Sequence, residues 1–227
     1  ILPNDYIKAV TDAVHAVGGI FVLDCIASGC LWVDMKALGV DVLISAPQKG
    51  WSGPPCCGLV MMSGAGVVAL EANTSTSFAC DLKKWRDIMV IYENGGHAYH
   101  ATVPTAAIAG FAAVMRETEA YGFDKVKSEQ QELGDAVRAL LASKGIKSVA
   151  AEGFGAPGVV VSYTQDAAVQ NGSKFAALGM QIAAGVPLMC DEPEGFRTFR
   201  LGLFGLDKLH NVERSVATLD KALSQVL

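Results

Sequence analysis

Two short apolar runs, at residues 20–23 and 40–44, most constrain the fold of this chain. Both have the length and β-branched content of buried strands, and a helical pattern at 34–38 separates them. This alternation favours an α/β fold with a largely parallel sheet. Asp24 follows the first run, and Lys49 follows the second in a loop rich in glycine and proline. Because the carboxyl ends of parallel strands share one edge, we expect the acid and the amine to lie together there.

The remaining pattern predicts elements on both sides of this stretch. Helices are expected at about 4–17, 63–72, 104–121, 123–144, 173–184 and 212–226, with a further helical pattern after Asp81. Strands are expected at about 58–62, 159–163, 186–189 and 198–201. The pattern changes beyond Gly122, so we predict a large domain at 1–121 that includes the interdomain helix, and a small α+β domain at 122–227.

Charge and hydropathy exclude several classes of partner. The chain has 227 residues, a formal net charge of -5 and no basic run, which argues against nucleic acid and anionic membranes as partners. The longest apolar stretch, residues 103–115, is too short to span a bilayer. No signal peptide is visible. None of the six cysteines forms a CxxC pair, which favours a reduced, cytoplasmic protein.

Two weaker motifs predict no site. Residues 64–69, GAGVVA, resemble a dinucleotide-binding fingerprint, but no strand ending in an acid follows about 20 residues later. His97 and His100 are three residues apart, but no third ligand is near them in the sequence, so we predict no metal site.

Lys49, Asp24 and Arg200 are the candidates for chemistry, and each also has an ordinary alternative. Lys49 could be a solvated loop lysine, although the apolar residues around it indicate a partly buried loop. The amine of Lys49 could carry a carbonyl cofactor as a Schiff base, and Asp24 could then hold the pyridinium nitrogen of that cofactor. The alternative for Asp24 is a helix cap, which is the more common role of an aspartate after a strand. Arg200 is framed by apolar residues and needs a carboxylate, either from a substrate or from an internal acid such as Asp191, Glu192 or Glu194.

Five segments, taken in order, resemble the class V aminotransferases of fold type I. They are DCIAS at 24–28, GVD at 39–41, SAPQK at 45–49, YHATVP at 99–104 and RLGLFG at 200–205. The alanine–glyoxylate and serine–pyruvate aminotransferases are the most similar members. The resemblance implies a largely parallel mixed sheet flanked by helices, a small α+β C-terminal domain, the cofactor pyridoxal 5'-phosphate and a homodimer.

The resemblance also implies a role for each matched residue. Lys49 would bind the cofactor covalently and move the substrate proton, and Asp24 would keep the pyridine nitrogen protonated. Gln48 would contact the cofactor phosphate. Tyr99 and Thr102 would reach the phosphate bound by the neighbouring subunit. Arg200 would bind the substrate carboxylate.

The implied reaction moves an amino group from alanine or serine to glyoxylate or pyruvate. Pro47 departs from the family, which often has serine before the glutamine. The resemblance further implies an earlier segment, not contained in this sequence, that carries part of the phosphate site and the first strands of the sheet. Alternatives are another class V activity, such as a lyase or a cysteine desulfurase, and a catalytically silent fragment of the fold. A desulfurase is expected to have histidine where this chain has Gln48.

Overall fold

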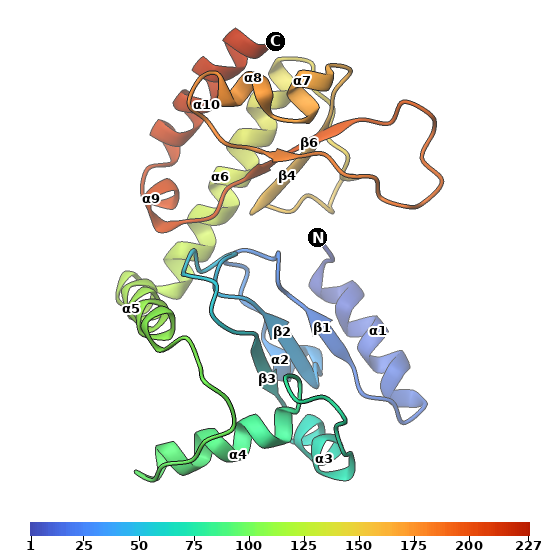
Figure 1. Ribbon diagram of the computed structural model, residues 1–227. Coiled ribbons are helices and arrows are strands. Elements are labelled where there is room, and N and C mark those ends of the chain that lie inside the picture. Colours follow the sequence, from blue (N-terminus) through green and yellow to red (C-terminus); the bar gives the residue numbers. More distant parts are fainter.

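The computed structural model describes residues 1–227 as two halves, each with its own sheet, joined by a long helix (Figure 1). The elements of the first half are α1 (Asn4–Ala16), β1 (Val22–Asp24), α2 (Met35–Leu38), β2 (Val42–Ser45), β3 (Leu59–Met62), α3 (Gly64–Ala72), α4 (Leu82–Glu93) and α5 (Thr105–Tyr121). Those of the second half are α6 (Phe123–Ser143), β4 (Val159–Tyr163), α7 (Ala167–Gln170), α8 (Ser173–Ala176), β5 (Ala183–Ala184), β6 (Thr198–Gly202), α9 (Leu206–Leu209) and α10 (Val212–Val226).

The first sheet has the order β1-β2-β3 and mixes two strand directions. β1 and β2 are parallel, as predicted, whereas β3 runs antiparallel to β2. The first two strands lie one or two residues later than their apolar runs. Ile20, at the start of the first run, is 46% exposed and precedes β1, whereas the buried Val40 donates to Met35 of the preceding helix rather than to a strand.

Polar caps explain where several helices of the first half begin. The side chains of Asp34, Ser63 and Asp81 accept hydrogen bonds from backbone N–H groups in the first turns of α2, α3 and α4. Gly39 ends α2 with a φ of 72°, a left-handed conformation that suits glycine. In α1 the N-cap residue is Pro3, which has no capping side chain, and the Asp5 carboxylate instead accepts a hydrogen bond from the backbone N–H of Tyr6 at 2.9 Å. Its amphipathic pattern still buries Ile7 and Thr11.

The second sheet is antiparallel, with the order β4-β6-β5. The predictions for β4, β6 and α10 are confirmed to within one residue. The predicted helix at 173–184 is wrong beyond Ala176, since Gly179 adopts a φ of 73° and β5 follows. The predicted strand at 186–189 is also wrong. That segment lies in an irregular loop, where Met189 has a φ of 61°.

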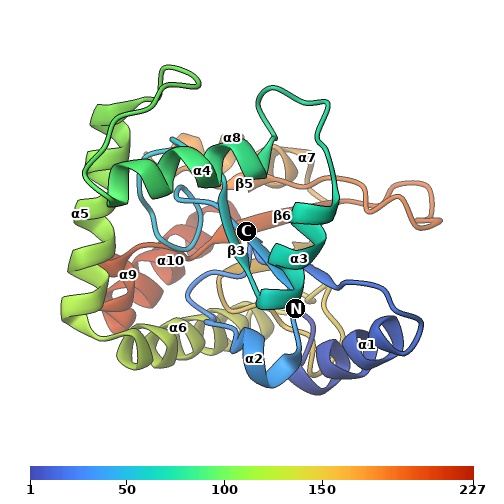
Figure 2. The ribbon, with the colours of Figure 1, turned by 90° about the horizontal axis from the view of Figure 1, so that it is seen from below.

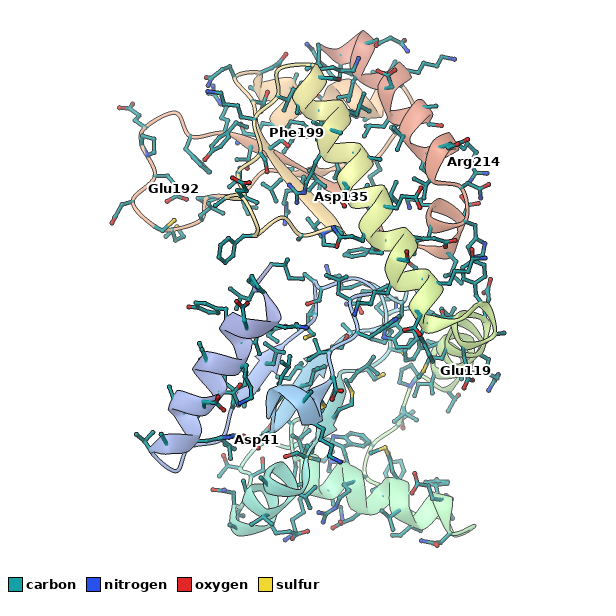
Figure 3. All side chains as sticks on the ribbon, turned by 180° about the vertical axis from the view of Figure 1, so that it is seen from behind. Asp41, Glu119, Asp135, Glu192, Phe199 and Arg214 are labelled. Carbon is teal, nitrogen blue, oxygen red and sulfur yellow. The ribbon has the colours of Figure 1, made fainter.

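Two apolar clusters form the cores of the halves. A cluster of 5 buried residues, including Ile7, Leu23 and Leu43, joins α1 and α2 to the first sheet. A larger cluster of 16 buried residues packs α6 and α10 against the second sheet around side chains such as Phe199 (Figure 3). Cys30 belongs to the larger cluster although it follows β1, so the loop after β1 reaches the second half. No helix has both the length and the apolar content needed to cross a membrane.

Candidate active site

Asp24 and Lys49 follow adjacent parallel strands at the same edge of the first sheet. Asp24 is the last residue of β1 and pairs in register with Ile44 of β2, so Lys49 comes five positions after the partner of Asp24. Asp24 is exposed and Lys49 is half-buried. The parallel pairing of the two strands is confirmed, and Asp24 and Lys49 come at and after their carboxyl ends.

The functional atoms of both residues are available. Oδ1 of Asp24 accepts a hydrogen bond from the backbone N–H of Ile26 at 2.9 Å, which forms an Asx turn and not the helix cap considered as the alternative, because no helix begins there. Oδ2 of Asp24 has no hydrogen-bond partner, and Nζ of Lys49 makes neither a hydrogen bond nor an ion pair. Gln48 is exposed and its amide makes no hydrogen bond. One carboxylate oxygen, an amine and an amide thus remain free to bind a ligand.

Backbone contacts fix the course of the lysine loop. The N–H of Ser52 donates to the carbonyl of Lys49, and that of Gly53 donates to the carbonyl of Pro47, both at 2.9 Å. Ser52 adopts a φ of 54°, so the turn after Lys49 is tight. A Cβ on Gly50 would lie 2.3 Å from the carbonyl oxygen of Gly29. The loops after β1 and β2 therefore touch through their backbones, and only glycine permits this approach.

An aromatic cluster holds the same loop from the other side. The ring of Trp51 lies 5.0 Å from that of Trp32, 5.9 Å from that of Phe111 and 6.2 Å from that of Phe123, between centroids. Trp32 also donates its indole N–H to the carbonyl of Phe123 at 2.9 Å. Edge-to-face contacts of this kind stabilise beyond the burial of area. The cluster anchors the lysine loop to α5 and α6, and the sequence pattern does not predict it because its members are far apart along the chain.

The loop after β1 also contacts the second half of the chain. Gln130 of α6 is fully buried, and its Nε2 donates to the carbonyls of Pro157 at 3.1 Å and Leu203 at 3.4 Å. Its Oε1 has no partner and faces Gly29, where a Cβ would lie 3.2 Å away. A Cβ on Gly158 would lie 2.6 Å from the ring of Phe204. These contacts connect the loop after β1 to the segment that follows β6, the strand that carries Arg200.

Arg200 lies on β6, paired with Val161 on one side and Ala183 on the other. Its Nε donates to the carbonyl of Ala184 at 2.8 Å, and its guanidinium makes no ion pair. The acids considered as internal partners are placed elsewhere. The carboxylate of Glu192 accepts backbone N–H groups within its own loop, from Leu188, Met189 and Cys190. That loop projects away from the second sheet (Figures 1 and 3).

Tyr99 and Thr102 lie in the loop between α4 and α5 and contact each other. The two hydroxyl oxygens are 3.3 Å apart, and both side chains are exposed, with Tyr99 at 71%. Neither makes a hydrogen bond with Asp24, Gln48 or Lys49. Within one chain, Asp24 and Lys49 thus lie at the same edge of the first sheet. Tyr99 and Thr102 lie together in the loop between α4 and α5, and Arg200 lies on the second sheet.

The two histidines of this loop do not converge. The ring of His100 packs on Phe78 and Trp85, with centroids 4.4 and 4.9 Å apart, and its Nε2 lies 3.0 Å from the carbonyl oxygen of Phe78. His97 packs on Tyr92 instead. A pocket of about 400 Å³ opens near these residues, between α3 and α4. It is lined by neither Asp24 nor Lys49, so it is separate from the site at the sheet edge.

Comparison with known proteins gives a consistent set of relatives. The model of the family "Aminotransferase class-V" matches residues 4–171. The small subunit of a soluble hydrogenase from Synechococcus sp. (strain PCC 6716) is 25% identical over 98% of this chain and 56% of its own length. Alanine–glyoxylate aminotransferase 1 of Saccharomyces cerevisiae is 27% identical over 57% of this chain and 35% of its own length.

The fold has matches among solved structures as well. The crystal structure of an alanine–glyoxylate aminotransferase from Nostoc sp. superposes with a TM-score of 0.78, at 19% identity, over 97% of this chain and 57% of that one. At this identity the likeness shows the fold alone, which is that of the fold type I transferases. The chain spans little more than half the length of the first relatives that it matches.

Proposed function

The chain belongs to the aminotransferase class-V family, and we propose that Lys49 and Asp24 form the centre of a transaminase site that uses pyridoxal 5'-phosphate. The amino group is moved from a small amino acid, alanine or serine, to a 2-oxo acid, glyoxylate or pyruvate. One observation carries this proposal. An amine without any partner and a carboxylate with one free oxygen follow adjacent parallel strands at the same edge of the sheet.

The side chains present fit this cofactor by their chemistry. The cofactor has an aldehyde, a ring nitrogen and a phosphate, which require an amine, a carboxylate and hydrogen-bond donors respectively. Lys49, Asp24 and the Gln48 amide supply one of each. Pro47 offers neither a hydroxyl nor a backbone N–H beside the phosphate, so this chain supplies fewer donors there than a serine would. When bound, the cofactor supplies an electron-accepting ring that stabilises negative charge at the substrate Cα.

The chain's own residues then bind, orient and move protons. The amine of Lys49 would take the proton from the substrate Cα and, once protonated, would act as the acid that gives it up again. The carboxylate of Asp24 would hold the ring nitrogen in its protonated form through a charge-assisted hydrogen bond. The aromatic cluster around Trp51 and the contact between Gly29 and Gly50 hold the loop, so that the amine keeps its position.

The free guanidinium of Arg200 supports its role as the substrate clamp. Its Nε is bound to a backbone carbonyl, which orients the group, while both terminal nitrogens are without a carboxylate. A planar guanidinium with two free N–H groups suits bidentate binding of a carboxylate. The observed geometry favours a substrate over an internal acid, because Glu192 is bound within its own loop.

We further propose that the enzyme is a homodimer with shared sites. Tyr99 and Thr102 are exposed in the single chain, and α4 buries none of its residues. Exposed apolar side chains gather on α4 and the adjoining loops, namely Phe78, Met89, Val90, Ile91, Tyr92, Tyr99 and Val103. A surface of this kind suits a protein interface. The two apolar clusters support a division into domains 1–121 and 122–227, although Cys30 of the first range packs into the second cluster. The six free cysteines support a cytoplasmic location.

A transamination assay tests the proposed reaction. The full-length enzyme is expected to convert alanine and glyoxylate to pyruvate and glycine, and Lys49→Ala is expected to abolish the conversion. Lys36→Ala is the matched control, since Lys36 is exposed on α2 and makes no ion pair. Activity retained in Lys49→Ala would reject the proposal. Sulfide release from cysteine or elimination without an acceptor would identify the desulfurase or lyase alternative, and no turnover with any substrate would identify a silent fold.

A further inference from the structure

Two adjacent cysteines occupy the segment that connects the lysine loop to β3. Sγ of Cys56 and Sγ of Cys57 are 3.6 Å apart. Cys57 is exposed and Cys56 is half-buried. Residues 54–58 belong to neither a helix nor a strand and make no backbone hydrogen bond, so the backbone there is free to adjust. The pairing of Leu59 with Ser45 places both thiols at the edge of the sheet where β2 ends.

We propose that Cys56 and Cys57 form a reversible modification site, a vicinal dithiol that peroxide oxidises to a disulfide. One thiolate attacks a peroxide oxygen, the O–O bond breaks, and hydroxide leaves to be protonated to water. The sulfenic acid that results is attacked by the neighbouring thiol, the S–S bond forms, and a second water leaves. The pair gives up two electrons and two protons, and one hydrogen peroxide is reduced to two waters.

The sequence separation makes this disulfide easy to reverse. The Cα atoms of adjacent residues are about 3.8 Å apart across a trans peptide, and the chain contains no cis peptide. Ordinary disulfides span about 4.4–6.8 Å between Cα atoms. A bond formed at shorter separation is strained and is therefore reduced more readily than a structural one. The pair suits a site that responds to oxidant and is restored by thiols.

The other four cysteines lack such a partner. Cys56 and Cys57 are the one pair of sulfurs in contact, while Cys30 is bound to the carbonyl of Gly50. Burial raises the pKa of Cys30 to about 11 and also raises the pKa of Cys25, and neither sulfur contacts a second thiol that could complete a disulfide. Partial burial, together with the contact with the Cys56 thiol, raises the pKa of Cys57 to about 11. Oxidation is therefore expected to accelerate as the pH rises.

Thiol counting and peptide mapping test the site without relying on enzymatic activity. Cys80 and Cys190 are exposed, so the double variant Cys80→Ser, Cys190→Ser removes competing thiols. Stoichiometric peroxide is expected to remove two titratable thiols per chain, to lower the mass by two hydrogens and to yield one peptide with Cys56 linked to Cys57. Excess reduced glutathione is expected to restore both thiols.

Cys57→Ser in the same background is the matched control. It is expected to form a sulfenic acid at Cys56, trapped by dimedone, and no internal disulfide. The proposal is overturned if peroxide leaves the pair reduced, links either cysteine to Cys25 or Cys30, or oxidises Cys56 and Cys57 separately. Because the readout is mass and thiol content, this result is independent of the proposed transamination.

Discussion

Asp41 (Figure 3) is the most extensively bonded carboxylate of the first half. It directly precedes β2, whereas Lys49 follows the other end of that strand. The side chain of Asp41 is only 5% exposed. Oδ2 accepts the backbone N–H of Phe21 at 2.7 Å and lies 2.8 Å from Nε2 of His15, while the Ser63 hydroxyl lies 3.3 Å from Oδ1. Burial by itself raises the pKa of Asp41, but these bonds outweigh it and hold the pKa below its ordinary 3.8.

Asp41→Asn is expected to lower the free energy of unfolding by about 1–3 kcal/mol, because buried donors lose their charged acceptor. The pKa of Asp41 is lower in the folded state than in the unfolded state. The carboxylate therefore contributes its full stabilisation of the fold above the unfolded-state pKa, and this stabilisation is lost as the pH falls through the folded-state pKa. The difference between wild type and variant should therefore shrink on acidification, measured by urea unfolding between about pH 7 and pH 3. Asp12→Asn, which removes a surface pair with Lys8, is the control. A difference independent of pH would contradict the assignment.

Arg200→Ala separates a substrate clamp from a structural arginine. A broken buried ion pair would cost about 3–5 kcal/mol, but Arg200 has no acidic partner, so we expect a small change in stability. KM for alanine or serine should rise steeply, while an amine without a carboxylate should be affected far less. Thermal unfolding and steady-state kinetics on the full-length enzyme decide the matter. A large loss of stability with an unchanged KM would exclude the clamp.

At the scale of elements, the contact between the loops after β1 and β2 positions the candidate amine. Gly50→Ala places a Cβ 2.3 Å from the Gly29 carbonyl, which forces the backbones apart. We expect a loss of about 1–3 kcal/mol in unfolding free energy. Gly58→Ala is a matched control, because nothing lies within 4 Å of its Cβ position and its backbone is not left-handed. Equal unfolding free energies in urea for the two variants would show that the contact is unimportant.

Local signals predicted most elements of the fold. Helix starts at Asp34, Ser63 and Asp81 depend on capping within one turn, which a sequence displays directly. The predicted helix at 173–184 failed because tertiary pairing of β5 with β6 overrides the local apolar pattern beyond Gly179. Strand positions were displaced by one or two residues for the same reason, since hydrogen bonds between strands set their bounds.

The candidate site was predictable only in part. The position of Asp24 relative to Lys49 follows from two parallel strands and was predicted from the apolar runs. The support of the lysine loop by Trp51, Gly50 and the buried Gln130 was not predicted, because it depends on contacts between residues separated by 19 to more than 90 positions. Sequence spacing carries no signal for such contacts. The roles of Tyr99 and Thr102 stay predictions, since they require a second subunit.

At the scale of the whole molecule, α4 lies at one end of the structure (Figure 1), lies in front of the rest of the chain when viewed from that end (Figure 2), and buries none of its residues. If two copies share their sites through this region, subunits with different defects should complement each other. Mixing Lys49→Ala subunits with Tyr99→Phe, Thr102→Val subunits of the full-length enzyme should restore activity, because one site of the mixed dimer carries no substitution. Sedimentation and activity measure this outcome. A monomer with full activity would reject the shared site.

Reductive labelling of Lys49 tests the central claim most directly. Full-length protein is incubated with pyridoxal 5'-phosphate, reduced with borohydride and digested, and each lysine-containing peptide is analysed by mass. The proposed site predicts stoichiometric label on Lys49, little label on the exposed Lys36, and loss of the specific label in Lys49→Arg, which keeps the charge. Label on another lysine, or none above the background of surface lysines, would contradict the assignment of Lys49 as the cofactor-binding amine.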